Sequence, residues 1–150
     1  MDPKVMELFR EHFEEKIPFN KVMGLKLIDA GGGKGSVRFD FKQELVGNYR
    51  LGILHGGIIS SALDVVGAVA VLGKFAEEGN MVGIGTVDMR VDFLTPAKGE
   101  YFLCTGTVMR FGRMLCSTRM ELHNDQGELH AAGTAIYRLS KMDKFETVNL

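Results

Sequence analysis

Positions 54–75 read LHGGIISSALDVVGAVAVLGKF and contain the most apolar stretch of the chain, Ile58 to Leu72. A helix from His55 or Gly56 to Phe75 would be about 30 Å long and apolar on nearly all sides, at about 1.5 Å per residue. Such a helix must be covered by other elements. The apolar stretch is shorter than the roughly 20 residues of a membrane span, and Asp64 lies at its middle. It therefore predicts a buried central helix.

Strand patterns lie on both sides of this predicted helix. Before it, three glycines at positions 31–33 separate two short runs, and after it the longer runs are divided by Thr95-Pro96-Ala97, Gly112 and Asn124-Asp125-Gln126-Gly127. The six predicted strands are Leu25–Asp29, Gly35–Phe41, Met81–Leu94, Tyr101–Phe111, Met114–His123 and Glu128–Leu139. This order predicts an α+β fold in which a curved antiparallel β-sheet wraps around one long central α-helix.

From Thr86 to Phe93 the longest predicted strand alternates between polar and apolar residues. Strict alternation places successive side chains on opposite faces of a sheet. The apolar face would carry Val87, Met89, Val91 and Phe93, and the polar face Thr86, Asp88, Arg90 and Asp92.

The remaining segments add short elements and no second domain. Asp2 followed by Pro3 is typical of a helix start, so residues 1–22 are predicted to form an N-terminal helix and a linker. Residues 43–54 read as a polar loop, Glu77 to Asn80 as the end of the central helix, and residues 140–150 as a tail. No domain boundary interrupts the pattern, so residues 1–150 are expected to form a single domain.

Composition restricts the class of protein further. The chain has 150 residues, 45% of them hydrophobic, with a formal net charge of -1, which indicates a globular domain with no basic stripe for a nucleic acid. Cys104 and Cys116 stand singly, so neither a metal site nor a disulfide framework is expected. Because the N-terminus lacks the apolar core of a signal peptide, we expect a cytoplasmic protein with reduced thiols and no membrane partner.

Asp64 is the first candidate for chemistry. It is the only ionisable residue between His55 and Lys74, and burying a lone carboxylate is costly unless something compensates. Desolvation increases the proton affinity of a carboxylate, which suits a general base. The alternative is a structural aspartate bonded to Ser60, Ser61 or the backbone at a subunit contact.

The helix start at His55-Gly56-Gly57 is the second candidate. Its unpaired N–H groups could bind a developing oxyanion, although a lone Gly-Gly is more often a loop-to-helix connection. A capping or packing role fits His55 better than that of a catalytic base. Gly57 and Asp64 would lie about 10 Å apart along one helix, too far to act on one carbon. Two copies with antiparallel helices could bring them together, so the site predicts a homodimer.

Other polar residues are weaker candidates. Asn48 could add a side-chain N–H to the oxyanion site, and Thr86 could orient a water, although each is also an ordinary turn or strand residue. Arg110, Arg113 and Arg90 could bind phosphates, and the alternative is a solvated surface.

Taken together, Leu54-His55-Gly56-Gly57, Asp64, Asp92-Phe93-Leu94-Thr95-Pro96-Ala97 and Arg110-Phe111-Gly112-Arg113 resemble the hotdog-fold acyl-CoA thioesterases. The resemblance is to the branch of the phenylacetate-pathway and 4-hydroxybenzoyl-CoA thioesterases and covers roughly residues 23–139. It implies dimers, often paired into homotetramers, with sites at the subunit interface. It implies an acyl-CoA substrate, no separate cofactor and no metal.

The same resemblance implies roles for individual residues. The Gly57 amide would bind the thioester oxygen, Asp64 of the partner chain would be base or nucleophile, and Thr86 would help to position water. Asn48 lies about one residue further from His55 than the supporting amide of some members. Arg113 would meet the nucleotide end of coenzyme A. Together with the candidates named above, the predicted substrate-binding residues are Gly56, Arg90, Arg110 and Arg113.

Three functions follow from these residues. The leading hypothesis is hydrolysis of an acyl-CoA thioester, with Asp64 activating water or attacking directly. A hydratase or dehydratase on the same scaffold would pair the acid with a histidine, for which His55 is the candidate. The third is a non-catalytic acyl-CoA-binding protein.

Overall fold

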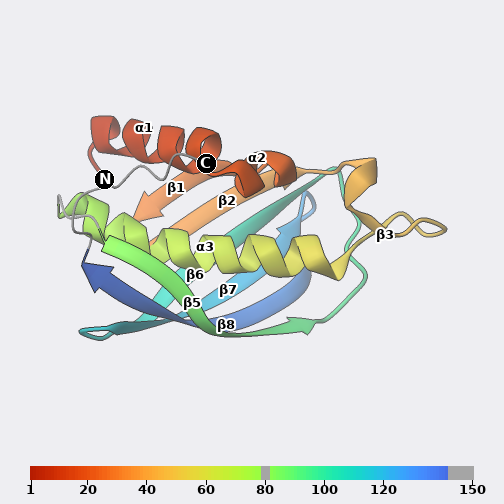
Figure 1. Ribbon diagram of the computed structural model, residues 1–150. Coiled ribbons are helices and arrows are strands. Elements are labelled where there is room, and N and C mark those ends of the chain that lie inside the picture. Colours follow the sequence, from red (N-terminus) through yellow and green to blue (C-terminus); the bar gives the residue numbers. More distant parts are fainter. Residues whose placement is uncertain (79–81, 142–150) are drawn as a thin grey trace.

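A computed structural model describes residues 1–78 and 82–141, and in it one long helix lies along a curved antiparallel sheet (Figure 1). The helix is α3, and the six strands follow the order β1-β2-β6-β7-β8-β5. Two of these strands precede α3 and four follow it, so the predicted α+β architecture is confirmed. The sheet elements are β1 (Lys26–Gly31), β2 (Lys34–Asp40), β5 (Val82–Phe93), β6 (Tyr101–Phe111), β7 (Leu115–Asn124) and β8 (Leu129–Lys141), around α3 (Gly56–Glu77).

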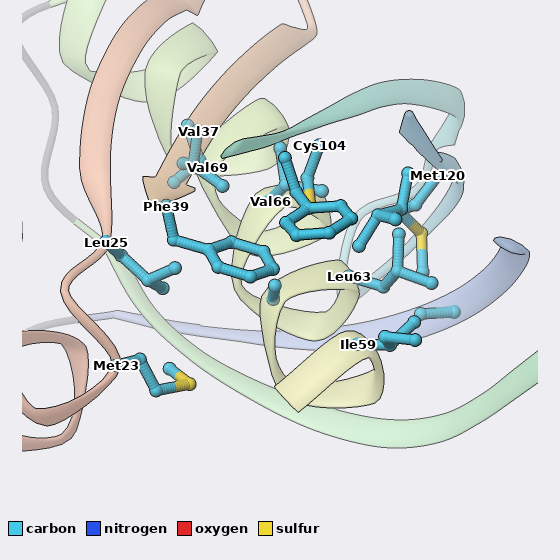
Figure 2. Close-up of a cluster of buried hydrophobic side chains, with 14 of the residues drawn as sticks. Met23, Leu25, Val37, Phe39, Ile59, Leu63, Val66, Val69, Cys104 and Met120 are labelled. Atoms are coloured by element: carbon cyan, nitrogen blue, oxygen red, sulfur yellow. The ribbon is translucent and has the colours of Figure 1, made fainter. Parts of the chain in front are cut away.

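The core lies between α3 and the concave face of the sheet. Ten of the 22 residues of α3 are buried, and Figure 2 shows Val66 and Val69 of the helix beside Val37 of β2 and Cys104 of β6. The helix approaches the sheet closely at Gly106 of β6, where a Cβ atom would lie 2.7 Å from the carbonyl oxygen of Val66. Small residues at the crossing therefore set the spacing between helix and sheet.

The length argument against a membrane span is wrong. By length and composition α3 could cross a membrane, a test that buried core helices of soluble proteins also pass. The sheet covers one side of α3, and ten residues of the helix are buried in the fold.

The N-terminal segment contains more helix than predicted. Asp2 caps α1 (Pro3–Glu11), as expected, and accepts from the Lys4 amide at 2.9 Å. A π-helical turn (His12–Lys16) and a second short helix, α2 (Pro18–Met23), replace the predicted linker, and α2 ends where Gly24 adopts a φ of 72°. Pro18 opens α2 because its fixed φ and missing N–H suit the first helical position.

The predicted polar loop before α3 also has regular structure. It holds a 3-10 turn (Gln43–Leu45) and a small hairpin of β3 (Val46–Asn48) and β4 (Ile53–Leu54). The hairpin packs against the helix start, where a Cβ at Gly47 would lie 2.7 Å from the Cα of His55.

Strand β5 departs from the predicted alternation. Thr86 pairs with Tyr137 and Asp88 pairs with Ile136, so Val87 is an extra residue in a β-bulge. The bulge places Thr86 on the same face as Met89, towards α3, whereas strict alternation put it on the opposite face. The predicted strand start at Met81, the helix stop at Gly79 and Asn80, and positions 142–150 of the predicted tail lie outside the described residues.

Candidate functional site

Asp64 lies at the side of α3 that faces β5. The Thr86 hydroxyl donates to its Oδ1 at 2.8 Å. Asp64 is half-buried in the single chain. It is not fully covered because β5 is the last strand of the sheet and leaves one side of α3 partly open.

Tyr137 of β8 contacts the same turn of α3 and was not anticipated from the sequence. Its hydroxyl donates to the carbonyl oxygen of Asp64 at 2.6 Å, and the residue is fully buried. Burial raises the pKa of the Tyr137 phenol far above its ordinary value, and the nearby Asp64 carboxylate raises it further. The sequence places Tyr137 in the last predicted strand and gives no sign of this contact.

The helix start is capped by His55, as the capping alternative predicted. The Gly57 amide donates to His55 Nδ1 at 2.8 Å, so this nitrogen is the unprotonated one and the Nε2 position carries the ring proton. A Cβ at the neighbouring Gly56 would meet the Phe93 ring of β5 at 3.3 Å. The predicted oxyanion donor is therefore engaged by its own chain, and the His55 ring must turn away before a ligand can accept from Gly57.

Gly57 and Asp64 lie on one side of α3 but about two turns apart, or about 10 Å along the helix axis. One chain therefore does not bring the predicted donor and the predicted acid together.

Asn48 and Arg90 make other contacts. Asn48 is exposed in the β3–β4 hairpin, and its side-chain oxygen accepts from the Arg50 amide at 3.2 Å, as an ordinary turn residue does. Arg90 lies on the convex face of β5 and forms an ion pair with Asp92 at 2.9 Å. Neither contacts Asp64 or Gly57 among the hydrogen bonds and ion pairs of residues 1–78 and 82–141.

Arg110 and Arg113 line a groove of about 540 Å³ at the β6–β7 hairpin. The groove is otherwise mainly apolar, and Leu115 and Ile136 are among its lining residues. The structure thus brings together the two hairpin arginines that the sequence paired, in a place separate from Asp64.

The geometry supports proton transfer or nucleophilic attack at one carboxylate. Thr86 fixes one carboxylate oxygen, and the half-exposed position leaves room for a reacting group. An oxyanion donor is needed as well, because acyl transfer develops negative charge on the carbonyl oxygen.

The curved sheet around one long helix is the hotdog fold that the motifs predicted. Residues 51–131, which include every predicted site residue except Asn48, match the thioesterase superfamily. The chain belongs to this superfamily and is a thioester hydrolase.

Named relatives cover most of the chain. The medium/long-chain acyl-CoA thioesterase YigI of Escherichia coli is 33% identical over 89% of this chain and 93% of its own length. Human acyl-coenzyme A thioesterase 13 is 33% identical over 77% of this chain and 80% of its own.

Solved structures share the fold. A Shewanella oneidensis protein related to the thioesterase superfamily superposes with a TM-score of 0.82 at 33% identity, covering 93% of this chain and all of the other. The Escherichia coli PaaI protein of the phenylacetic acid degradation operon has a TM-score of 0.75 at 19% identity over 90% of this chain and 92% of its own. The PaaI likeness concerns the fold alone.

Proposed function

We propose that the protein hydrolyses an acyl-CoA thioester to a carboxylic acid and free coenzyme A. The relatives named as acyl-CoA thioesterases support this substrate class. The observation that carries the proposal is the Asp64–Thr86 pair, a carboxylate at the middle of an apolar helix that is held by a hydroxyl 2.8 Å away. The acyl-CoA binder and the hydratase or dehydratase have less support, because these relatives are named as hydrolases.

The proposed chemistry assigns the reacting oxygen. Because Thr86 donates to Oδ1 of Asp64, we assign proton transfer to Oδ2. Oδ2 takes a proton from water as the water oxygen attacks the thioester carbon, and the C–S bond then breaks and the proton passes to the departing thiolate. In the alternative route Oδ2 attacks the carbon itself, the thiolate leaves, and water hydrolyses the mixed anhydride.

The site in this proposal is completed by a second copy. The outer edge of β5 is unpaired among the described residues, since β8 is its only neighbour in the sheet. Pairing two β5 edges antiparallel would place two α3 helices antiparallel and bring the Gly57 amide of one chain towards Asp64 of the other. Further pairing of dimers into a tetramer stays a prediction.

The groove at the β6–β7 hairpin is the proposed place for the phosphates of coenzyme A. Arg110 and Arg113 have no ion-pair partner among the described residues, and guanidinium groups bind phosphates well. Arg90 is not part of this groove and forms an exposed ion pair with Asp92 on β5.

Neither cysteine enters the proposed reaction. Burial raises the pKa of the Cys104 and Cys116 thiols, and only the thiolate is nucleophilic. Both are free and buried, which supports the proposed cytosolic location. Water and the substrate are the only reactants, with no separate cofactor.

The test is thiol release from short, long and aromatic acyl-CoA esters by the protein and its Asp64→Asn variant. We expect the substitution to lower kcat by about 10² to 10⁴, the contribution of a general base. The matched control is Asp92→Asn, the same change on the convex face of β5, which should leave kcat unaltered. Near-parental turnover by Asp64→Asn would refute the proposal, and binding without thiol release by the unmodified protein would favour the acyl-CoA binder.

A further inference from the structure

Asp64 is held at two points by one cross-strand pair. Thr86 of β5 donates to its carboxylate at 2.8 Å, and Tyr137 of β8 donates to its main-chain carbonyl at 2.6 Å. Thr86 and Tyr137 lie directly opposite each other in the β5–β8 register. The pair therefore grips both the side chain and the backbone of the same helical residue.

Gly67 makes room for the Tyr137 hydroxyl. A Cβ at position 67 would collide with that hydroxyl and lie 3.0 Å from Thr118 Oγ1. Glycine in the interior of a helix is less favourable than alanine by about 1 kcal/mol. The missing side chain at Gly67, called the notch below, therefore calls for a structural explanation. Space for the tyrosine hydroxyl supplies one.

The Tyr137 hydroxyl is a permanent donor. Its pKa is raised mainly by burial and then by the Asp64 carboxylate, while Thr118 and the Ala68 amide act weakly in the opposite direction. The phenol therefore keeps its proton at any pH at which thioester hydrolysis is assayed. The contact with the Asp64 carbonyl does not switch with pH.

We infer that Tyr137 is a positioning residue that fixes the turn of α3 carrying Asp64, with Gly67 as the notch that admits its hydroxyl. The inference rests on the proposed role of Asp64. A half-exposed carboxylate on a long helix depends on such contacts, because a misplacement of about 1 Å in a reacting group can cost about 10²-fold in rate. Neither Tyr137 nor Gly67 needs to touch the substrate for this purpose.

The main test is Tyr137→Phe, which keeps the ring in the core and deletes the donor. We expect kcat to fall by about tenfold, the value of one well-placed hydrogen bond, with KM unchanged because no binding contact is lost. The matched control is Tyr101→Phe. Tyr101 starts β6 and stacks under the Arg38 guanidinium at 3.8 Å, so losing its hydroxyl should alter neither parameter.

A second measurement separates positioning from general support of the fold. In an Asp64→Asn background, Tyr137→Phe should cause no further loss, because the residue to be positioned is already disabled. A purely structural tyrosine would lower the residual rate in both backgrounds. Gly67→Ala should reproduce the loss in kcat by displacing the hydroxyl, with circular dichroism confirming that each variant is folded at the assay temperature.

The outcomes distinguish the inference from the proposed function. Parental kcat in Tyr137→Phe, together with an inactive Asp64→Asn, would overturn the inference and leave the proposed function intact. An equal loss in both backgrounds would overturn it too. An active Asp64→Asn would remove the proposed function itself.

Discussion

The two edge strands of the sheet, β1 and β5, have similar local structure, but in the described part of the chain only the β1 edge is covered by other segments. Each edge strand carries one β-bulge, at Ile28 in β1 and at Val87 in β5, and both bulge residues are exposed, at 48% and 59%. At the β1 edge, the N-terminal helices reach over the strand, and Glu14 accepts from the Leu27 amide at 3.0 Å. Among the described residues, no strand of the chain pairs with the outer edge of β5.

The difference shows that one edge of the sheet contributes to the stability of the fold and the other edge lies beside the candidate site. Side chains such as Arg10, which donates to the Leu27 carbonyl at 3.4 Å, satisfy the backbone of β1 and close that edge. The open β5 edge leaves one side of α3 half-exposed, and Asp64 lies there. An unpaired strand edge is a template for pairing, so the same feature exposes the acid and offers a surface to a second copy.

The largest effect after loss of Asp64 is expected from deleting the Gly57 amide. In the proposed dimer, pairing at the open β5 edge brings this amide to the Asp64 of the partner chain. Gly57→Pro removes the N–H in the first turn of α3, where proline is tolerated, and should lower kcat by about 10² to 10³, as for one oxyanion donor. Mixed oligomers of Gly57→Pro and Asp64→Asn should recover activity, since one of their two sites would be intact. Failure of the mixture to recover, with both variants folded and associated, would mean that each chain builds its own site.

A smaller effect is expected from changing the β-bulge at Val87. Lysine on an edge strand opposes edge-to-edge pairing, so Val87→Lys should weaken self-association by at least about tenfold, or about 1.4 kcal/mol. Sedimentation velocity measures the association, and the specific activity should fall as the variant is diluted.

The matched control for this change is Ile28→Lys. It places the same charge on the equivalent bulge of the covered edge and should leave association and activity as they are. A Val87→Lys protein that stays associated and active at every concentration would show that the copies meet elsewhere.

The smallest effect is expected at the covered side, in the pH dependence of stability. Glu77 at the end of α3 accepts from the Gly32 amide at 2.8 Å and lies 3.2 Å from the Met1 ammonium group. These contacts, led by the Gly32 hydrogen bond, lower the pKa of Glu77 from its ordinary value of 4.5. A lowered folded-state pKa adds stability above the unfolded value that is lost as the pH falls through the folded value.

Glu77→Gln should therefore flatten the decline in unfolding free energy between about pH 5 and pH 3, with little change at neutral pH beyond the lost ion pair. Urea unfolding at several pH values measures this. An unchanged slope would show that Glu77 contributes nothing to stability in this range, and kcat should be unaffected.

Much of the architecture could be predicted from the sequence. The apolar stretch around Asp64 gave the central helix, and alternation and turn residues gave the six strands, because both depend on periodicity. The N-terminal helix α2 was missed, since its six residues show too little periodicity to separate a helix from a linker.

The site was only partly predictable. Asp64 was evident as an isolated charge, and a capping role for His55 followed from its place before the helix. The bulge at Val87 has no signature in the sequence, so Thr86 was assigned to the wrong face. Tyr137 was missed because its contact joins residues that are 73 positions apart.

Val87 has a consequence beyond its own side chain. Val87 is the one residue of β5 without a partner in β8. Its presence determines which face of the sheet each preceding side chain of β5 occupies. Removing it would preserve every side chain that takes part in the reaction, yet Thr86 would rotate to the convex face and lose Asp64. A one-residue deletion in β5 would thus separate Thr86 from Asp64 without changing either residue. Alignments of related chains should therefore compare the length of this strand as well as the identity of the acid.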